Sequence, residues 1–269
     1  MSAATATAGL LPRRRPSAFS PRLTAATASR VLRQLSHDRR TIAMLLVLPS
    51  ALLGLLYLIW RDLPTRPGQR STFDTAGLAM LAILPFVVMF LITSIAMLRE
   101  RTTGTLERLL TTPLSRLDLL LGYGAAFGVA AAAQAVVTVT IATTVYGLDV
   151  EGSVWLVVLI AVVDALLGVA LGLLASAFAR SEFQAVQFMP VVVLPQFFLC
   201  GLLVPRGQMA DWLHVISDVL PLTWAVDGLD RVGTQSSASG RLWADIAIVA
   251  GAALLALALA AGTLRRRTS

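Results

Sequence analysis

The residues of this 269-residue sequence whose types and spacing suit chemistry lie in the segment 99–123, between two long apolar runs. Leucines at helical spacing in this segment predict a short amphipathic helix. Periodicity alone leaves two interpretations open, because the charges of such a helix are either solvated or contact a partner. The charged side chains of the segment are Arg99, Glu100, Arg101, Glu107, Arg108, Arg116 and Asp118.

Local signals bound this helix. The helix is expected to start near Gly104, which lies three residues before Glu107. A carboxylate in the first turn of a helix interacts with the backbone N–H groups that have no partner within the helix. Pro113 ends the helix, because proline disfavours helical geometry at the preceding residue. Ser115 and Asp118 have the spacing of an N-cap with an acidic partner, so a further helix is expected to begin there. The short helix is therefore expected to lie across a membrane face.

Motifs for catalysis are absent from the sequence. It contains no GxxxxGK[ST] phosphate loop, no HExxH, no GxSxG and no paired carboxylates of the kind that hydrolases use. The single cysteine, Cys200, and two distant histidines, His37 and His214, form no cluster of metal ligands. We expect no enzymatic site and no cofactor in this chain, so that any ATP and Mg would be bound by a separate ATPase.

The composition is that of an integral membrane protein. Hydrophobic residues make up 57% of the chain and charged residues 14%, and the mean hydropathy is +0.77. In soluble domains, charged residues make up about a quarter of the sequence. The net charge of +7 comes from arginines that flank apolar runs. We therefore expect a membrane as the partner of these charges, and no nucleic acid.

Six apolar runs each reach or approach the roughly 20 residues that cross a bilayer. They predict an all-α integral membrane protein with six transmembrane helices in the region 42–264. Residues 1–21 are predicted to be a disordered tail, 22–41 an interfacial amphipathic helix, and 265–269 a basic tail. The six runs are Ile42–Trp60, Leu78–Leu98, Leu119–Val145, Val154–Phe178, Phe183–Val204 and Leu242–Leu264.

The distribution of arginine predicts the orientation. Most arginines lie before the first run, in the segment after the second run, and at the carboxyl end of the chain. Because cytoplasmic segments carry the excess of basic residues, both termini and the segment 99–123 are expected to be cytoplasmic.

The fifth run and its continuation are irregular. Pro190 and Pro195 free backbone carbonyls, so this helix is expected to be buried in protein or to line a cavity, or else to be a proline-kinked helix without a special role. After Pro205, two short apolar patterns are too short to span a membrane. They predict a pair of short outer re-entrant helices at about 205–230.

Polar residues inside the apolar runs are few. A charge at the centre of a bilayer costs at least about 2.5 to 3.5 kcal/mol on insertion scales, so Asp164 is expected to be protonated, paired or hydrated. One interpretation is a proton site of a carrier that works alone. The favoured one is a structural hydrogen bond to Gln134 or Thr138, since such residues often join helices.

Two parts of the chain resemble the type-2 ABC transporter permeases, and in particular the daunorubicin-resistance class of bacterial permeases. The first is the segment 99–122, with Arg99-Glu100, Gly104-Thr105-Leu106-Glu107, Leu110, Thr112-Pro113, Ser115-Arg116 and Leu120-Leu121-Gly122. The second is the segment 198–229, with Gly201, Pro205, Trp212, Pro221-Leu222 and Ala225-Val226-Asp227.

The resemblance implies a permease subunit of an ATP-driven exporter in a bacterial cell membrane, with two permease copies, as a homodimer, and two ABC ATPase copies. It implies that residues of about 99–117 form a coupling helix that docks on the ATPase, through Arg99, Glu100, Arg101, Gly104, Thr105, Glu107 and Arg108. The expected substrate is a hydrophobic or amphiphilic drug, antibiotic or lipid. The alternatives are a lipid-linked polysaccharide and a stand-alone proton-coupled carrier.

Flexible and aromatic side chains within the spans suit a path for bulky apolar substrates, although core packing is the default for each one alone. The expected path residues are Met89, Phe90, Met189, Gln196, Phe197 and Phe198.

Overall fold

The computed structural model describes residues 19–64, 70–103 and 115–265, and in these ranges the chain forms helices and no strand. Six of the helices are long and apolar enough to cross a membrane, which confirms the predicted all-α membrane protein with six spans. They are α2 (Arg39–Trp60), α3 (Thr72–Thr102), α5 (Arg116–Thr144), α6 (Val154–Ala175), α7 (Glu182–Leu199) and α10 (Gly240–Arg265).

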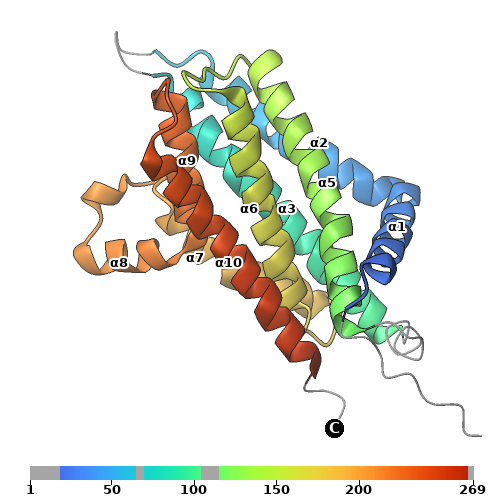
Figure 1. Ribbon diagram of the computed structural model, residues 1–269. Coiled ribbons are helices and arrows are strands. Elements are labelled where there is room, and N and C mark those ends of the chain that lie inside the picture. Colours follow the sequence, from blue (N-terminus) through green and yellow to red (C-terminus); the bar gives the residue numbers. More distant parts are fainter. Residues whose placement is uncertain (1–18, 65–69, 104–114, 266–269) are drawn as a thin grey trace, which may run out of the picture.

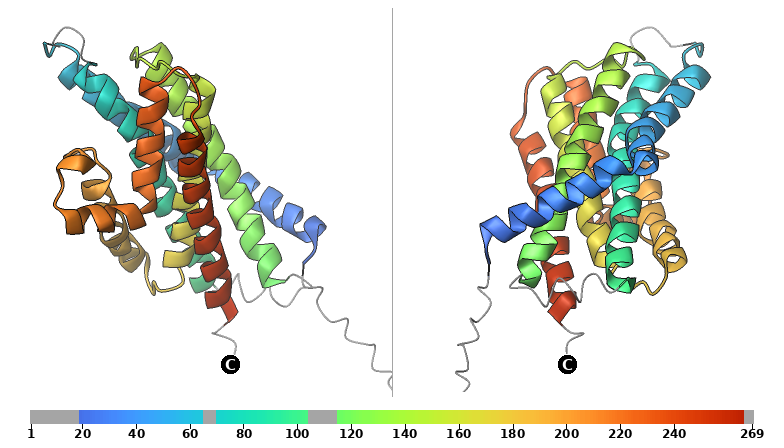
Figure 2. Two further views of the ribbon diagram at one scale, coloured as in Figure 1. Left: turned by 60° about the vertical axis from the view of Figure 1, so that its left-hand side comes forward. Right: turned by 90° about the vertical axis from the view of Figure 1, so that its right-hand side faces the viewer.

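The six long helices run roughly alongside one another in one bundle (Figure 1). We call the end at which α3 ends and α5 begins the inner end, following the orientation predicted from the arginines, and the opposite end the outer end. Helix α10 also ends at the inner end (Figures 1 and 2).

The centre of the bundle is the contact between α3 and α6, the most extensive helix contact in the described chain. A Cβ atom built on Gly168 would lie 2.4 Å from the backbone oxygen of Phe86, and one on Gly172 would lie 2.6 Å from that of Phe90. Small residues allow helices to approach closely in membranes, where van der Waals packing drives their association. These two glycines therefore set the distance between α3 and α6.

The second span is longer than its apolar run. Helix α3 continues to Thr102, so that Arg99, Glu100 and Arg101, assigned by the sequence to the start of the coupling helix, form the last turns of this span. The helix can extend because Arg99 and Glu100 find ion-pair partners on neighbouring elements.

Helix α1 (Pro21–His37) precedes the first span and lies obliquely across the bundle (Figure 2, right). It ends at His37, earlier than the predicted boundary at 41, because the carboxylate of Asp38 accepts hydrogen bonds from the backbone amides of Arg40 and Thr41 and so begins α2.

The fifth span, α7, ends at Leu199 and not at the predicted Val204. The chain turns at Gly201, which has a φ of +97°. Residues with a Cβ atom rarely adopt this backbone conformation. A short helix η1 (Arg206–Gln208) and the helices α8 (Asp211–Val219) and α9 (Pro221–Thr234) follow. Helix α8 lies beside the bundle at about half its height, and α9 rises towards the outer end (Figures 1 and 2).

The burial expected for α7 is not found in the single chain. Only 17% of its apolar window is buried, against 67% for α3, and both Pro190 and Pro195 are exposed. The helix packs chiefly against α3 along one side, which leaves its other side open.

Candidate functional site

A cavity of about 850 Å³ lies at the outer half of the bundle, between the ends of α2 and α7 and the helices α3 and α9. One part of its wall is apolar and includes Ala79, Met80, Phe197 and Leu202. The other part is charged and includes Arg206, Asp227, Asp230 and Arg231. An apolar wall with a few polar groups is typical of a site for a small molecule.

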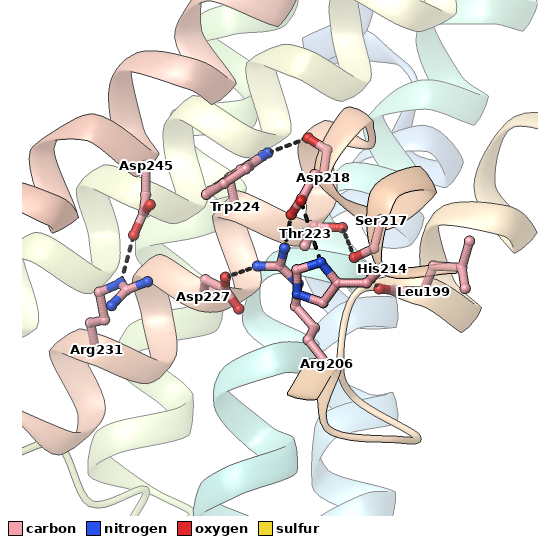
Figure 3. A network of polar contacts seen from close by, with 10 residues as sticks. All are labelled: Leu199, Arg206, His214, Ser217, Asp218, Thr223, Trp224, Asp227, Arg231 and Asp245. Atoms are coloured by element: carbon pink, nitrogen blue, oxygen red, sulfur yellow. Dashed lines mark hydrogen bonds and ion pairs between the residues drawn. The ribbon is translucent and has the colours of Figure 1, made fainter. Parts of the chain in front are cut away.

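The charged wall is held together by Arg206 (Figure 3). Its guanidinium donates hydrogen bonds to the carboxylates of Asp218 and Asp227, so that it connects η1 with α8 and α9. The same guanidinium lies over the ring of Trp224, 5.3 Å from the ring centre. Trp224 in turn donates its indole N–H to the backbone oxygen of Asp218, over 2.9 Å. Arg206 is therefore the common partner of the two outer helices.

Burial raises the pKa of the Asp227 carboxyl above its ordinary value, and the neighbouring Arg206 offsets this only in part. A second ion pair, between Arg231 Nε and Asp245 Oδ2 at 2.8 Å, connects α9 to α10 (Figure 3). The side chain of Asp245 is almost fully buried, so this pair fixes the place of α9 on the bundle.

A separate polar cluster joins α1 to the inner end. Arg30 donates to the hydroxyl of Tyr123 over 2.8 Å and lies 3.4 Å from Oε1 of Glu100. On the neighbouring helices, Arg99 donates twice to Glu182, over 2.6 and 3.1 Å, and so connects α3 to α7. The polar residues at the end of α3 thus bind other elements of the same chain.

The predicted cap at the start of α5 is confirmed, and it does more than begin a helix. Asp118 and Ser115 form a reciprocal capping box. Asp118 also accepts hydrogen bonds from the backbone amide of Ser20, over 2.7 Å, and from the hydroxyl of Thr24, over 3.1 Å. One carboxylate therefore both caps α5 and holds the start of α1.

We predict that Asp118→Ala releases α1 while leaving the span α5 in place. The carboxylate makes two hydrogen bonds to α1, each worth about 1 kcal/mol, so backbone amide exchange in residues 20–31 is expected to rise by about tenfold or more. The hydroxyl of Ser115 still accepts from the backbone amide of residue 118, so the cap of α5 is only weakened. Hydrogen exchange followed by mass spectrometry measures this.

The control is Asp74→Ala, which removes the comparable contact with Ser71 at the start of α3. Its exchange is expected to increase at the outer end only. Equal protection of residues 20–31 in the Asp118 variant and the wild type would contradict the assigned role.

Of the predicted docking residues, Gly104, Thr105, Glu107 and Arg108 lie outside the described residues. Glu100 is 8% exposed and faces α1. Arg99 is exposed and bound to Glu182, and Arg101 has intermediate exposure.

The predicted path residues lie in different surroundings, although the rings of Phe197 and Phe198 are in contact, with centres 5.5 Å apart. Phe197 lines the outer cavity, and Met189 packs against the main core. Gln196 is buried, and its side-chain oxygen accepts a hydrogen bond from the amide of Leu222 over 3.3 Å. Phe198 is 53% exposed, whereas Met89 and Phe90 are fully buried.

Asp164 and Gln134 are both fully buried. Within the described parts of the chain, neither carboxylate oxygen of Asp164 and neither amide atom of Gln134 has a hydrogen-bond partner. The hydrogen bond predicted between Asp164 and Gln134 or Thr138 is therefore absent. Helices α5 and α6 are antiparallel, and Gly128 of α5 faces Leu166 of α6. Gln134 therefore lies closer to the outer end of the bundle than Asp164 does.

The sequence did not reveal Arg206 or Arg30 as central residues. Their partners lie between 12 and 93 residues away, so no local spacing connects them. One local spacing does point to a polar contact in this region: His214 and Asp218 lie four residues apart on α8, and His214 Nδ1 is 3.4 Å from Asp218 Oδ2.

Comparison with known proteins gives a family and several relatives. The model of the ABC-2 type transporter family matches residues 22–232, from α1 to α9. The probable multidrug ABC transporter permease YbhR of Escherichia coli K12 is 26% identical over 165 residues, which are 61% of this chain and 45% of that protein.

Two other relatives show similar levels of identity. The probable multidrug permease YbhS of Escherichia coli K12 is 24% identical over 171 residues, covering 61% of this chain and 45% of the relative. ABC transporter G family member 20 of Dictyostelium discoideum is 29% identical over 164 residues, which are 60% of this chain and 22% of that protein. The match thus spans less than half the length of each of these relatives.

Proposed function

Because the chain belongs to the ABC-2 type transporter family, and is thus a membrane permease, we propose that it forms the export pathway of an ATP-driven transporter for hydrophobic or amphiphilic compounds. The observation that carries this proposal is the family match over residues 22–232, which includes five of the six spans and the outer helices. Two relatives are named as probable multidrug permeases, which favours drugs or other amphiphiles over polysaccharides.

The proposed complex contains two permease copies and two ABC ATPase subunits, which bind ATP and Mg. The open sides of α2 and α7, with exposed Leu55, Leu58, Val191 and Leu194, would face the second permease copy or lipid. Both termini and the segment between α3 and α5 would face the cytoplasm of a bacterial cell, as the arginine distribution predicts.

The proposed mechanism is alternating access. Closure of the ATPase dimer would move the segment between α3 and α5, and the inner ends of the spans would re-pack. The ion pair of Arg99 with Glu182 and the contact of Arg30 with Glu100 would pass this motion to α7 and to α1. The outer cavity would then receive the substrate near Phe197 before its release.

The test of coupling uses Glu107→Arg, which reverses a charge of the proposed docking segment without replacing Arg30 or Glu100. Reversal of an interfacial charge places like charges together, so ATP-driven transport is expected to fall about tenfold or more with unchanged membrane insertion. Uptake of a hydrophobic dye into inverted vesicles that contain both subunits, with ATP added, measures it.

The matched control is Asp211→Arg, which makes the same change at an exposed residue of α8. It should transport like the wild type. Undiminished ATP-driven uptake by the Glu107 variant would contradict docking through this segment.

A second candidate function is proton-coupled transport without an ATPase, which the buried and unpartnered carboxylate of Asp164 favours. The same vesicles decide between the two. A pH gradient without ATP should drive no uptake if the ATP-driven proposal holds, and it should drive uptake in the absence of an ATPase if Asp164 is a coupling site.

A further inference from the structure

A second cavity lies at the inner end, between α1, α2, α3 and α5, apart from the outer cavity. Its volume of about 440 Å³ is within the range of small-molecule sites, which is about 300 to 1,000 Å³. It is lined by apolar side chains, among them Leu35, Met44, Leu91, Ile95 and Ala96, and by the polar side chains of Asp38, Arg99, Glu100 and Tyr123.

The lining of this cavity is apolar at one end and polar at the other, as the surface of an amphiphile is. Along α3, the apolar Leu91, Ile92 and Ile95 lie deeper in the span, and Glu100 lies near its inner end. Along α2, Met44 is deeper and Asp38 precedes the helix. The polar ends of both walls are therefore at the same side of the cavity, where the head group of an amphiphile in a leaflet would be.

Glu100 is the feature that points to a ligand. Its side chain is 10% exposed, and Oε1 is 3.4 Å from Arg30, which makes its shorter hydrogen bond to Tyr123. The other oxygen, Oε2, is buried and has no hydrogen-bond partner in the described ranges. The hydroxyl of Tyr123 interacts with the same carboxylate, but in the described ranges no donor has hydrogen-bond geometry to Oε2. A buried acceptor without a donor is costly, and a charged one more so, so a ligand that donates to Oε2 would be favoured.

The neighbouring charges favour a cation. Asp38 lines the same cavity, and its hydrogen bonds from the Thr41 side chain, the Thr41 amide and the Arg40 amide lower its pKa, which keeps it ionised. Arg99 also lines the cavity, but it donates twice to Glu182. The cavity thus presents two carboxylates, of which Glu100 is near Arg30, and one arginine, which donates to Glu182 and is also near Asp38.

We propose that the inner cavity binds an amphiphile whose head group is a protonated amine, with the amine donating to Oε2 of Glu100 and the apolar tail lying along Met44, Leu91 and Ile95. This inference deepens the proposed function, on which it rests for the role of the ligand, because it names amphiphilic amines as the substrate class and the inner leaflet as their source. Binding itself requires only the permease chain.

Photolabelling of the purified full chain tests the proposal. The chain is placed in nanodiscs of phosphatidylcholine, whose head group has no net charge and no N–H donor, and is labelled with a diazirine-bearing dodecylamine. Labelled peptides from residues 34–44 and 91–103 are expected. Dodecylamine should compete at a concentration about tenfold lower than dodecanol, since an ionic hydrogen bond replaces a neutral one.

Two variants locate the site. Glu100→Gln keeps the size of the side chain and removes its charge, and labelling is expected to fall about fivefold or more. Ala96→Phe fills the cavity with Glu100 unchanged and should also abolish labelling, even if the Glu100 variant is poorly folded. The control Asp62→Asn removes an exposed carboxylate that lines neither cavity and should leave labelling intact.

The outcomes are distinct. Equal competition by dodecanol, full labelling of both variants, or labels only outside these peptides would each overturn the proposal. Replacing half of the lipid with phosphatidylethanolamine separates two sources of the amine: suppressed labelling identifies a lipid head group, and unchanged labelling identifies a free amphiphilic amine. Because no ATP or ATPase is present, a failure of ATP coupling leaves this result unaffected.

Discussion

Replacement of Arg206 by alanine is expected to destabilise the outer helices and to abolish transport. Arg206 is 15% exposed, and its loss leaves Asp227 and Asp218 without their common counter-ion. Removal of one partner of a buried ion pair costs about 3 to 5 kcal/mol, and partial exposure reduces this to about 2 to 4 kcal/mol here. Thermal unfolding in detergent and dye transport in vesicles measure the two effects.

The stability of the Arg206 variant is also expected to depend on pH. Burial raises the pKa of the Asp227 carboxyl, and loss of the arginine raises it further. A carboxyl whose pKa is higher in the folded state stabilises the fold when protonated, and this contribution is lost as pH rises through the raised pKa. The variant should therefore be more stable at acidic than at alkaline pH.

Two further variants show whether the buried pair is responsible. Arg206→Ala combined with Asp227→Asn should recover part of the lost stability, because it removes the uncompensated charge. Arg61→Ala removes a pair with Asp62 that is largely exposed, and it should change stability by less than about 1 kcal/mol. Equal losses for the Arg206 and Arg61 variants would refute the role assigned to Arg206.

Gly168→Ala should have the second large effect. Its Cβ atom would lie 2.4 Å from the backbone oxygen of Phe86, a distance that no side-chain rotation can relieve. The helices α3 and α6 would have to separate along their whole contact, which we expect to cost about 3 kcal/mol or more, since overpacking of a core costs about 1 to 3 kcal/mol even where side chains can adjust.

Gly251→Ala is the matched control. Gly251 lies within α10, and no atom lies within 4 Å of a Cβ atom placed there. Because alanine is a better helix former than glycine, this variant should be neutral or stabilised by up to about 1 kcal/mol. The yield of monodisperse protein and its unfolding temperature distinguish the two variants. A Gly168 variant as stable as the Gly251 variant would show that α3 and α6 are not in close contact.

The sequence was sufficient for features that depend on neighbouring residues. Six spans follow from six apolar runs of adequate length, and the cap of α5 follows from the spacing of Ser115 and Asp118. The end of α7 was misplaced because residues 200–204 are still largely apolar, whereas the turn at Gly201 depends on a backbone angle that hydropathy does not record.

Features that join distant parts of the chain could not be predicted from local patterns. Arg30 meets Glu100 across 70 residues and Tyr123 across 93. Glu100 was expected to face a docking partner because it lies among charged residues, but α1 covers it. The unpartnered state of Asp164 likewise depends on the relative heights of α5 and α6, which sequence spacing leaves open.

The close contact of α3 and α6 restricts how the permease can move. Where two backbones touch without intervening side chains, sliding would drive one main chain into the other, so these helices form a single rigid block. The turn at Gly201 separates α7 from the outer helices, and α9 is held on the bundle by the pair of Arg231 and Asp245. A re-packing of the spans is therefore expected to keep α3 and α6 together and to move α7, which is buried along one side only, relative to them.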